Sequence, residues 1–420
     1  MCYIFGDKGP NLIFHVCYAY VTKMLRREAS FICYLCHSLS ISMKHTITIL
    51  SLLLSTVLPL LASTESTLPF SLKLTGRLLV DGGTYINSPK ALHSGVNVTD
   101  LRLGAKLRIQ SCWYTKIDVG FAGNKVSIKD AFTEYGKDGN YFRAGYMLGY
   151  YSIDQSNSTN QLLFNTGANV AETFYPGRRI GVSYTRDMPA YYLSAGAFWG
   201  DGLGFSETTK QGYNLSGRVV WRPVNNPDNL LHIGTGAIFR VPNEDTDTHS
   251  RQISLSSKGV TCLSSPSTLD LTIEDARSQV QANGECLLYH NRWMLQTEYM
   301  LTTIRRSNGM PSFTAHGGYV TGGFLLKGSR YAYDSLDALP VMPQEPHSLL
   351  LVCRYNYTNL NDSHSNLMGG SQHDISIGIN YYLNKYISSR LNYAHLWLDK
   401  YSALGKCTIN ILQLRLQVRF

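Results

Sequence analysis

Charged residues are scarce in this sequence. Asp, Glu, Lys and Arg make up 16% of its 420 residues, against about a quarter in typical soluble proteins. Aromatic residues reach 11% and no low-complexity tract is present, which excludes a disordered chain. Helical spacing of apolar residues is nearly absent beyond residue 70, and after residue 62 no run of about 18 apolar residues could form a transmembrane helix.

Cysteine is present but forms no framework. Four of the nine cysteines lie in the first 42 residues, where Cys33 and Cys36 have metal-like spacing but no second pair. The other five stand at wide, irregular spacings and are odd in number. We therefore predict neither a disulfide scaffold nor a zinc or redox site, and no metal or cofactor.

The apolar run "ITILSLLLSTVLPLL" lies near the front of the chain. It follows Met43 and a short basic start, and small residues follow it at Ala62 and Ser63. This order is typical of a secretory signal peptide. We predict that residues 1–42 are a spurious N-terminal extension, that 43–62 are the signal peptide, and that 63–420 form one exported domain.

Alternating apolar and polar residues dominate that domain, as in "FSLKLTGRLLV" (70–80) and "HDISIGINYYL" (373–383). Strict alternation predicts strands with one apolar and one polar face. A soluble β-sandwich and a membrane barrel both produce this pattern. Export, strands of about ten residues, and aromatics near strand ends favour a transmembrane antiparallel β-barrel. We expect about 16 strands, at 70–80, 100–110, 113–122, 126–136, 141–149, 178–186, 191–199, 213–222, 230–241, 278–290, 293–304, 313–326, 348–359, 373–384, 386–397 and 409–420.

The polar faces of these strands carry mostly positive charge. Beyond residue 62 the chain has 33 Lys and Arg against 27 Asp and Glu. Where alternation is clean, however, the inward positions hold fourteen basic residues and three acidic ones. A narrow passage lined by one sign of charge concentrates counter-ions, so the lumen should pass anions. The basic candidates in the anion path are Arg102, Lys106, Arg108, Lys116, Arg143, Arg218, Arg222, Arg415 and Arg419.

Several segments resemble the phosphate-selective porins O and P of bacterial outer membranes. They are "VSIKDAFTEYG" (126–136), "YPGRRIGVSY" (175–184), "YVTGGFLLKGSRYAYD" (319–334), "DISIGINYYLNKYISSRLNYAH" (374–395) and the closing "LQLRLQVRF". The resemblance covers most of the exported domain. It implies a sixteen-stranded barrel, usually a homotrimer, in which a long third loop (here 150–177) folds into the lumen.

The resemblance also implies specific site residues. Lys129 matches the constriction lysine, although a bulge there could change the direction of its side chain. Arg178 and Arg179 leave the third loop, and Arg102, Lys106 and Arg108 resemble an arginine ladder for phosphate or polyphosphate. The third loop itself holds no lysine or arginine, which departs from a basic constriction.

We therefore predict an outer-membrane porin of a Gram-negative bacterium for passive diffusion of anions, with phosphate as the suspected solute. The alternative is a non-conducting surface, adhesion or structural barrel. No Ser, His and acid set indicates an enzyme, and no nucleic-acid partner is expected. The terminal strand ending in Phe420 resembles the segment that the barrel assembly machinery recognises, and lipid should cover the outer face.

Overall fold

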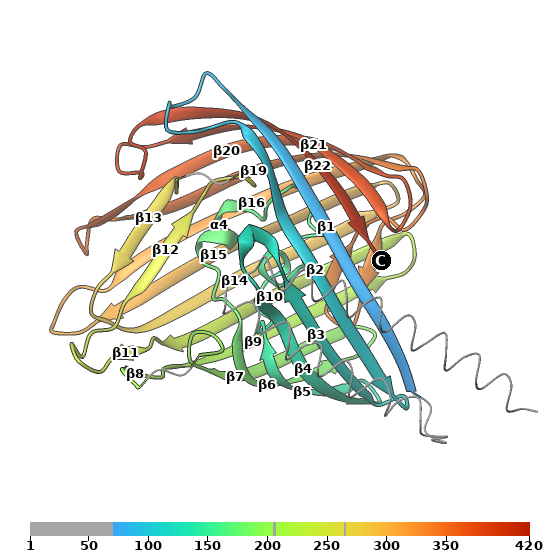
Figure 1. Ribbon diagram of the computed structural model, residues 1–420, viewed down its shortest axis with the longest axis horizontal. Coiled ribbons are helices and arrows are strands. Elements are labelled where there is room, and N and C mark those ends of the chain that lie inside the picture. The colour runs from blue at the N-terminus through green and yellow to red at the C-terminus, as the bar shows by residue number, and fades with distance from the viewer. Residues whose placement is uncertain (1–69, 205–206, 264–265) are drawn as a thin grey trace, which may run out of the picture. The chain divides into compact units, whose positions relative to one another are not determined.

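The computed structural model describes residues 70–420, except 205–206 and 264–265. The predicted extension (1–42) and signal peptide (43–62) lie outside the described residues. In the described part of the chain, sixteen strands close into one antiparallel barrel, and β1 pairs with β22 to complete it (Figure 1). This confirms the predicted fold class. Among the described residues, no helix is long and apolar enough to cross a membrane.

The barrel strands follow the predicted order, with boundaries that differ by a few residues. They are β1 (Phe70–Ile86), β2 (Gly95–Ile109), β3 (Trp113–Gly120), β4 (Ser127–Lys137), β5 (Asn140–Met147), β6 (Arg179–Asp187), β7 (Tyr191–Trp199), β9 (Tyr213–Asn225), β10 (Asn229–Val241), β14 (Ala276–His290), β15 (Trp293–Arg306), β16 (Phe313–Lys327), β19 (Ser348–Asp362), β20 (Leu367–Tyr382), β21 (Ile387–Leu398) and β22 (Cys407–Arg419).

Small elements decorate the connections. Three short antiparallel pairs are β8 (Thr209–Lys210) with β11 (Glu244–Asp245), β12 (Ile253–Ser257) with β13 (Leu269–Ile273), and β17 (Ala332–Asp334) with β18 (Leu339–Val341). The described helices are the 3-10 turn η1 (Ala122–Asn124), α3 (Ile153–Ser156) and α4 (Asn169–Thr173). Because β19 and β20 extend further than expected, the loop predicted at 360–372 shrinks to 363–366.

The wall of the barrel is uneven in height. Strands β3 and β5 have 8 residues, and β6 and β7 have 9. On the other side, β14, β16 and β19 have 15 residues and β20 has 16. A strand of 8 residues spans about 26 Å and one of 16 about 53 Å, so the tall wall extends well beyond the apolar band of a membrane.

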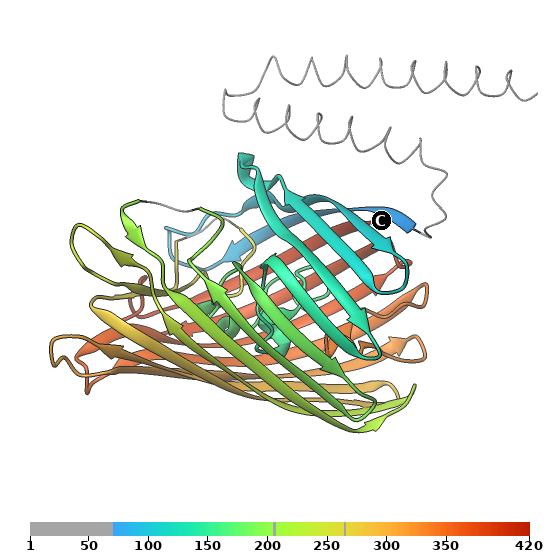
Figure 2. The same cartoon turned by 90° about the horizontal axis from the view of Figure 1, so that it is seen from below.

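Three connections fold into the lumen. The third loop (148–178) carries α3 and α4 inside the ring of strands (Figures 1 and 2). Glycine makes room for it, because a Cβ at Gly236 would lie 2.1 Å from the Tyr151 carbonyl oxygen. The loop 242–275 joins it from the same end, where Ser257 donates a hydrogen bond to Asn169.

The third inserted connection is 328–347, between β16 and β19. The strand count places it at the opposite, turn end of the barrel. Its β17–β18 pair contacts the third loop, since Asn157 Nδ2 donates to the Pro340 carbonyl (3.2 Å) and the Met342 N–H donates to Gln161 Oε1 (3.0 Å). The lumen is therefore narrowed from both ends.

Candidate ion pathway in the barrel lumen

A cavity of about 810 Å³ remains beside the inserted segments. Strands β1–β5 form one side of it, and the third loop and segment 328–347 form the other. Ten basic and seven acidic residues line it. The basic ones lie mainly on the strands, whereas four acidic ones, Asp154, Glu172, Asp334 and Asp337, lie on the inserted segments. The passage therefore has a basic wall that faces carboxylates.

Lysines stand side by side on the basic wall. Lys73 of β1 is the register partner of Lys106 of β2, which in turn pairs with Lys116 of β3. Like charges directly opposite each other destabilise a sheet. Lys116 is compensated by Asp118 (3.0 Å) and Asp130 (2.7 Å). Within the described residues, Lys73 and Lys106 have no ion pair, so their charges remain available to a solute.

Arginines continue this wall on both sides of the lysines. Arg108 is exposed and has only the Tyr114 ring beneath it (5.4 Å to the centroid) among the described residues. Arg77 and Arg102 are neighbours in register and share one carboxylate, Asp100, at 2.6 and 2.7 Å. One carboxylate for two guanidiniums leaves net positive charge.

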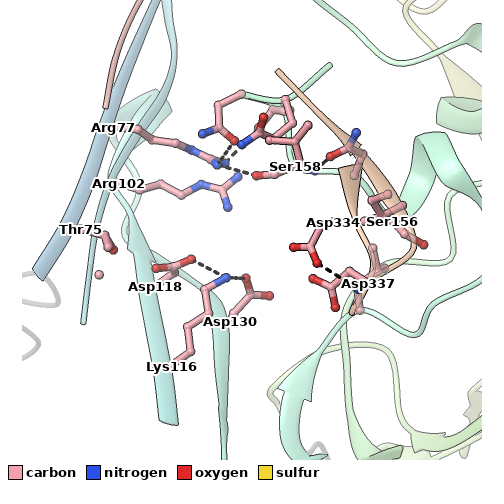
Figure 3. Close-up of a pocket in the computed structure, with 18 of the residues that line it drawn as sticks. Thr75, Arg77, Arg102, Lys116, Asp118, Asp130, Ser156, Ser158, Asp334 and Asp337 are labelled. Atoms are coloured by element: carbon pink, nitrogen blue, oxygen red, sulfur yellow. Dashed lines mark hydrogen bonds and ion pairs between the residues drawn. The ribbon is translucent and has the colours of Figure 1, made fainter. Parts of the chain in front are cut away.

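Arg77 also fastens the third loop to the wall. One nitrogen, Nη1, donates to Ser158 Oγ (2.6 Å) and Asn160 Oδ1 (3.0 Å), and Nη2 donates to Thr159 Oγ1 (3.0 Å). Figure 3 shows Arg77 and Arg102 extending from the strands toward Ser158. Residues 150–177 of the loop contain no lysine or arginine, and the wall supplies the positive charge at this contact.

On the far side, Glu298 of β15 holds the loop. Its carboxylate accepts hydrogen bonds from the backbone N–H groups of Ile153 (2.9 Å) and Asp154 (3.0 Å), at the start of α3, and from Tyr319 Oη (2.7 Å). The side chain is 2% exposed. Glu298 and Arg77 therefore hold the loop from opposite walls.

Lys129 lies in a β-bulge, which resolves the direction left open by the sequence. The register shifts between Asp118 and Val119 of β3, leaving Lys129 without a partner on that strand. Its side chain lies over Gly120, where an added Cβ would be 2.7 Å from Lys129 Cε. Gly120 pairs with the inward Arg102. Lys129 therefore points to the lumen side, although it does not line the cavity.

Segment 328–347 supplies the opposing carboxylates, and Figure 3 shows Asp334 and Asp337 across the passage from Lys116. Asp337 accepts a hydrogen bond from Tyr150 Oη (2.5 Å). Asp334 accepts one from the Leu336 N–H (3.0 Å) within its own turn. Burial, and then the charge of Asp337, raises the pKa of Asp334 above its usual range.

Buried arginines hold this segment in place. Arg218 donates to the carbonyls of Asp337 (3.1 Å) and Ala338 (2.9 Å), and Arg222 donates to the carbonyl of Ser335 (2.9 Å). Both arginines point inward as predicted, yet each is at most 2% exposed. They do not line the cavity.

The remaining predicted residues divide in the same way. Arg143, Arg178 and Arg419 line the cavity. Arg143 pairs with Glu134 (2.6 Å), Arg178 pairs with Asp130 (2.8 Å), and Arg419 donates to a backbone carbonyl (2.7 Å). Arg179 pairs with Asp201, and Arg415 pairs with Asp81 (2.6 Å). These last two are buried outside the cavity.

Sequence reasoning missed several inward carboxylates. The sequence analysis did not identify five carboxylates on the inward face, which are Asp81, Asp100, Asp130, Glu134 and Glu285. Asp81 lies beyond the expected end of its strand. Asp100 and Asp130 lie beside register shifts, which reverse the parity. A basic residue at the paired position of the neighbouring strand, as for Glu134 and Arg143, is the signal that could have found them. Among the described residues, no group of His, Cys, Asp and Glu could hold a metal ion.

Known proteins share this architecture. The structure of an anion-selective porin from Comamonas acidovorans matches with a TM-score of 0.56 at 12% identity, over 84% of this chain and 100% of that chain. In-vitro folded OmpT, an outer membrane protein of Vibrio cholerae, matches with a TM-score of 0.55 at 11% identity, over 84% and 98%. OmpF of Salmonella typhi matches with a TM-score of 0.51 at 11% identity, over 83% and 97%. Similarity at this identity shows the fold.

Family membership follows from the sequence itself. No curated protein matches this chain. The model of the family described as phosphate-selective porin O and P, however, matches residues 75–420. That range contains nearly the whole closed barrel and all the inserted segments. Its family and fold are those of a channel and not of an enzyme, and the chain belongs to the phosphate-selective porin O and P family of outer-membrane porins.

Proposed function

We propose that this porin passes anions by passive diffusion, and that phosphate or a related oxyanion is among them. The observation that carries the proposal is the row formed by Lys73, Lys106 and Arg108. These three cations line the cavity and have no carboxylate partner in the described part of the chain. Unpaired charge in a narrow passage with low-dielectric walls attracts solutes of the opposite sign. An anion-selective structural relative supports the same selectivity.

Phosphate fits the guanidinium groups around this row. A planar guanidinium can donate two parallel hydrogen bonds to an oxyanion and keeps its charge at any physiological pH. Arg102 and Arg108 belong to the ladder implied by the family, and Lys129 faces the lumen beyond them. We place Arg143, Arg178 and Arg419 in the same path because they line the cavity. Arg179, Arg218, Arg222 and Arg415 act instead by supporting the wall and the inserted segments.

The remaining features of the proposal concern assembly and export. We propose a homotrimer, because in-vitro folded OmpT of Vibrio cholerae, which shares the fold, was solved in a trimer form. We also propose that residues 43–62 direct export, and that the barrel assembly machinery recognises the strand ending in Phe420.

Recording from single channels in planar lipid bilayers tests the proposal. In a potassium chloride gradient, the permeability ratio of chloride to potassium should exceed one. Submillimolar phosphate should reduce the chloride current if phosphate binds in the passage. A ratio at or below one would overturn anion selectivity. An unchanged current in phosphate would overturn only the choice of phosphate.

The inserted connections fill much of the lumen, and this favours a second candidate function, that of a non-conducting barrel. Three connections occupy it, and Arg218, Arg222, Arg354, Arg390 and Arg415 are all almost fully buried beneath them. A non-conducting structural or adhesive barrel would show this filling. The complete absence of conductance from correctly folded protein would support it.

A further inference from the structure

Three histidines point outward from the tall wall. His316 of β16 lies between Ala315 and Gly317, His373 of β20 lies between Gln372 and Asp374, and His395 of β21 lies between Ala394 and Leu396. Their neighbours in the chain are buried on the inner side, so alternation places the imidazoles on the lipid side. Ionisable groups on such a surface are costly and call for an explanation.

Their depth puts them at the edge of the apolar band. Along β20 the outward residues run from Tyr381 near the turn end, through Ile379, Ile377 and Ile375, to His373. This run spans eight residues, or about 26 Å along the strand, which at a strand tilt of about 40° covers about 20 Å of the roughly 25 Å band of outer-membrane barrels. Beyond it the outward position is the polar Ser371. The histidines therefore lie at head-group level on the loop side.

Tyrosine hydroxyls fix the rings of His316 and His373 and leave one nitrogen of each free, whereas Nδ1 of His395 contacts Asn410 Oδ1 (2.6 Å). Tyr299 Oη lies 3.0 Å from His316 Nδ1, and Tyr355 Oη lies 2.7 Å from His373 Nδ1. With the phenol donating to Nδ1, the imidazole carries its proton on Nε2. Neither Nε2 has a partner among the described residues. The ring of Tyr357 lies between the two imidazoles, with centroids 5.7 and 4.6 Å away.

Two exposed arginines stand above the histidines on the same wall. Arg305, the penultimate residue of β15, lies four residues beyond Leu301, the register partner of His316, which is about 13 Å along the strand. Arg277 precedes Ser278, the register partner of Arg305, so the two arginines are neighbours. Neither has a carboxylate partner in the described part of the chain. Adjacent like charges are unfavourable unless an anion bridges them.

No histidine lies on the described strands of the short wall, β3 to β7. Its outward residues include Ile117, Ile128, Ile180, Val182 and Leu193, which are exposed and aliphatic. A face of this composition suits acyl chains or another copy of the barrel. The polar residues on the tall wall therefore indicate contact with a different kind of molecule.

We propose that the histidine face, defined as Arg277, Arg305, His316, Tyr357 and His373, binds the phosphorylated head group of a membrane lipid. The arginines attract the phosphate, as basic residues near a membrane surface attract anionic lipids. The Nε2–H groups donate to phosphate or hydroxyl oxygens below. The apolar band beneath His373 receives the acyl chains.

Native mass spectrometry of the intact porin in neutral detergent tests this inference. The probes are phosphatidic acid and diacylglycerol, which differ only in the phosphate. The unmodified protein should retain phosphatidic acid in preference to diacylglycerol. The variant R305Q/H316Q/H373Q should retain phosphatidic acid about tenfold less, since it loses three donors of modest individual strength. The matched control is H347Q, because His347 makes the same contact with Tyr381 Oη (2.7 Å) at the turn end.

Three outcomes would overturn the inference. Equal retention of the two lipids would remove the phosphate from recognition. Equal loss in H347Q would show a general effect of surface histidines. A change in subunit number in R305Q/H316Q/H373Q would identify the face as a contact between copies. The bilayer conductance of the variant should stay unchanged, which separates this test from that of the anion pathway.

Discussion

Lys106 lies directly opposite Lys73 in the register of β1 and β2, and no carboxylate in the described part of the chain pairs with either. Such a pair lowers the stability of a sheet, so its presence where it faces a cavity indicates a role in binding solutes. Its unpaired charge should therefore contribute to anion selectivity.

The double variant K73Q/K106Q should lose anion selectivity. Removing two unpaired cations reduces the positive potential of the passage. We expect the permeability ratio of chloride to potassium to fall about threefold or more. On the scale of free energy, a tenfold change in such a ratio corresponds to about 1.4 kcal/mol. Reversal potentials in planar bilayers measure it. The control is K137Q, at the end of β4 and outside the cavity. An equal ratio in the two variants would contradict the assignment.

Removing the opposing carboxylates should have the reverse effect. The variant D334N/D337N keeps the shape of segment 328–347 but removes two negative charges that face Lys116 across the passage (Figure 3). The permeability ratio of chloride to potassium should rise by a similar factor. A suitable control is E345Q, because Glu345 lies on the same segment but does not line the cavity. A ratio that falls would show that the carboxylates position cations instead of opposing anions.

Anion selectivity should also increase as the solution becomes acidic. The pKa of Asp334 is raised, so this carboxylate takes up its proton and loses its negative charge at a higher pH than an ordinary aspartate. The permeability ratio should rise as pH falls through that raised pKa. D334N, which is neutral throughout, should start higher and change less over the same range. Identical pH profiles for the two proteins would rule out Asp334 as the titrating group.

The sequence predicts the strands of the barrel better than the side chains that point into its lumen. Alternation over ten-residue strands is strong, and one apolar face must meet lipid, so all sixteen strands were found. Alternation fails locally at β-bulges, because one extra residue reverses which side chains of the strand point inward, as at Lys129 and Asp130.

The inserted segments are harder still to predict. No periodicity indicates that 328–347 turns back into the barrel, because the contacts that hold it come from distant side chains such as Arg218 and Arg222. For the same reason, inward arginines that support a loop could not be told from inward arginines that face the passage.

Glu298 should control the order of the third loop. Its carboxyl group accepts two backbone N–H bonds from the start of α3, one on each oxygen. E298Q replaces one of these oxygens with an amide nitrogen that can only donate, so one buried N–H loses its acceptor and the loop should move more. We expect open-channel current noise to increase severalfold, with brief closures. E345Q serves as the control here too, because Glu345 does not contact the third loop. Unchanged open-channel current noise in E298Q would mean that Arg77 alone holds the loop.

Phe420 should be needed to close the barrel. Its backbone exchanges two hydrogen bonds with Gly76 of β1 (3.1 and 2.9 Å), and its ring covers Gly76, where an added Cβ would lie 2.3 Å from the ring. A chain lacking Phe420 loses both bonds and the aromatic contact at the seam between β1 and β22. We expect several-fold less heat-modifiable, folded barrel in outer-membrane fractions, measured by gel mobility. G76V should reduce assembly as well, because its side chain displaces the ring. Conservative F420Y keeps ring and backbone and should assemble normally. Normal assembly of the truncated chain together with failure of F420Y would contradict a closing role for this contact.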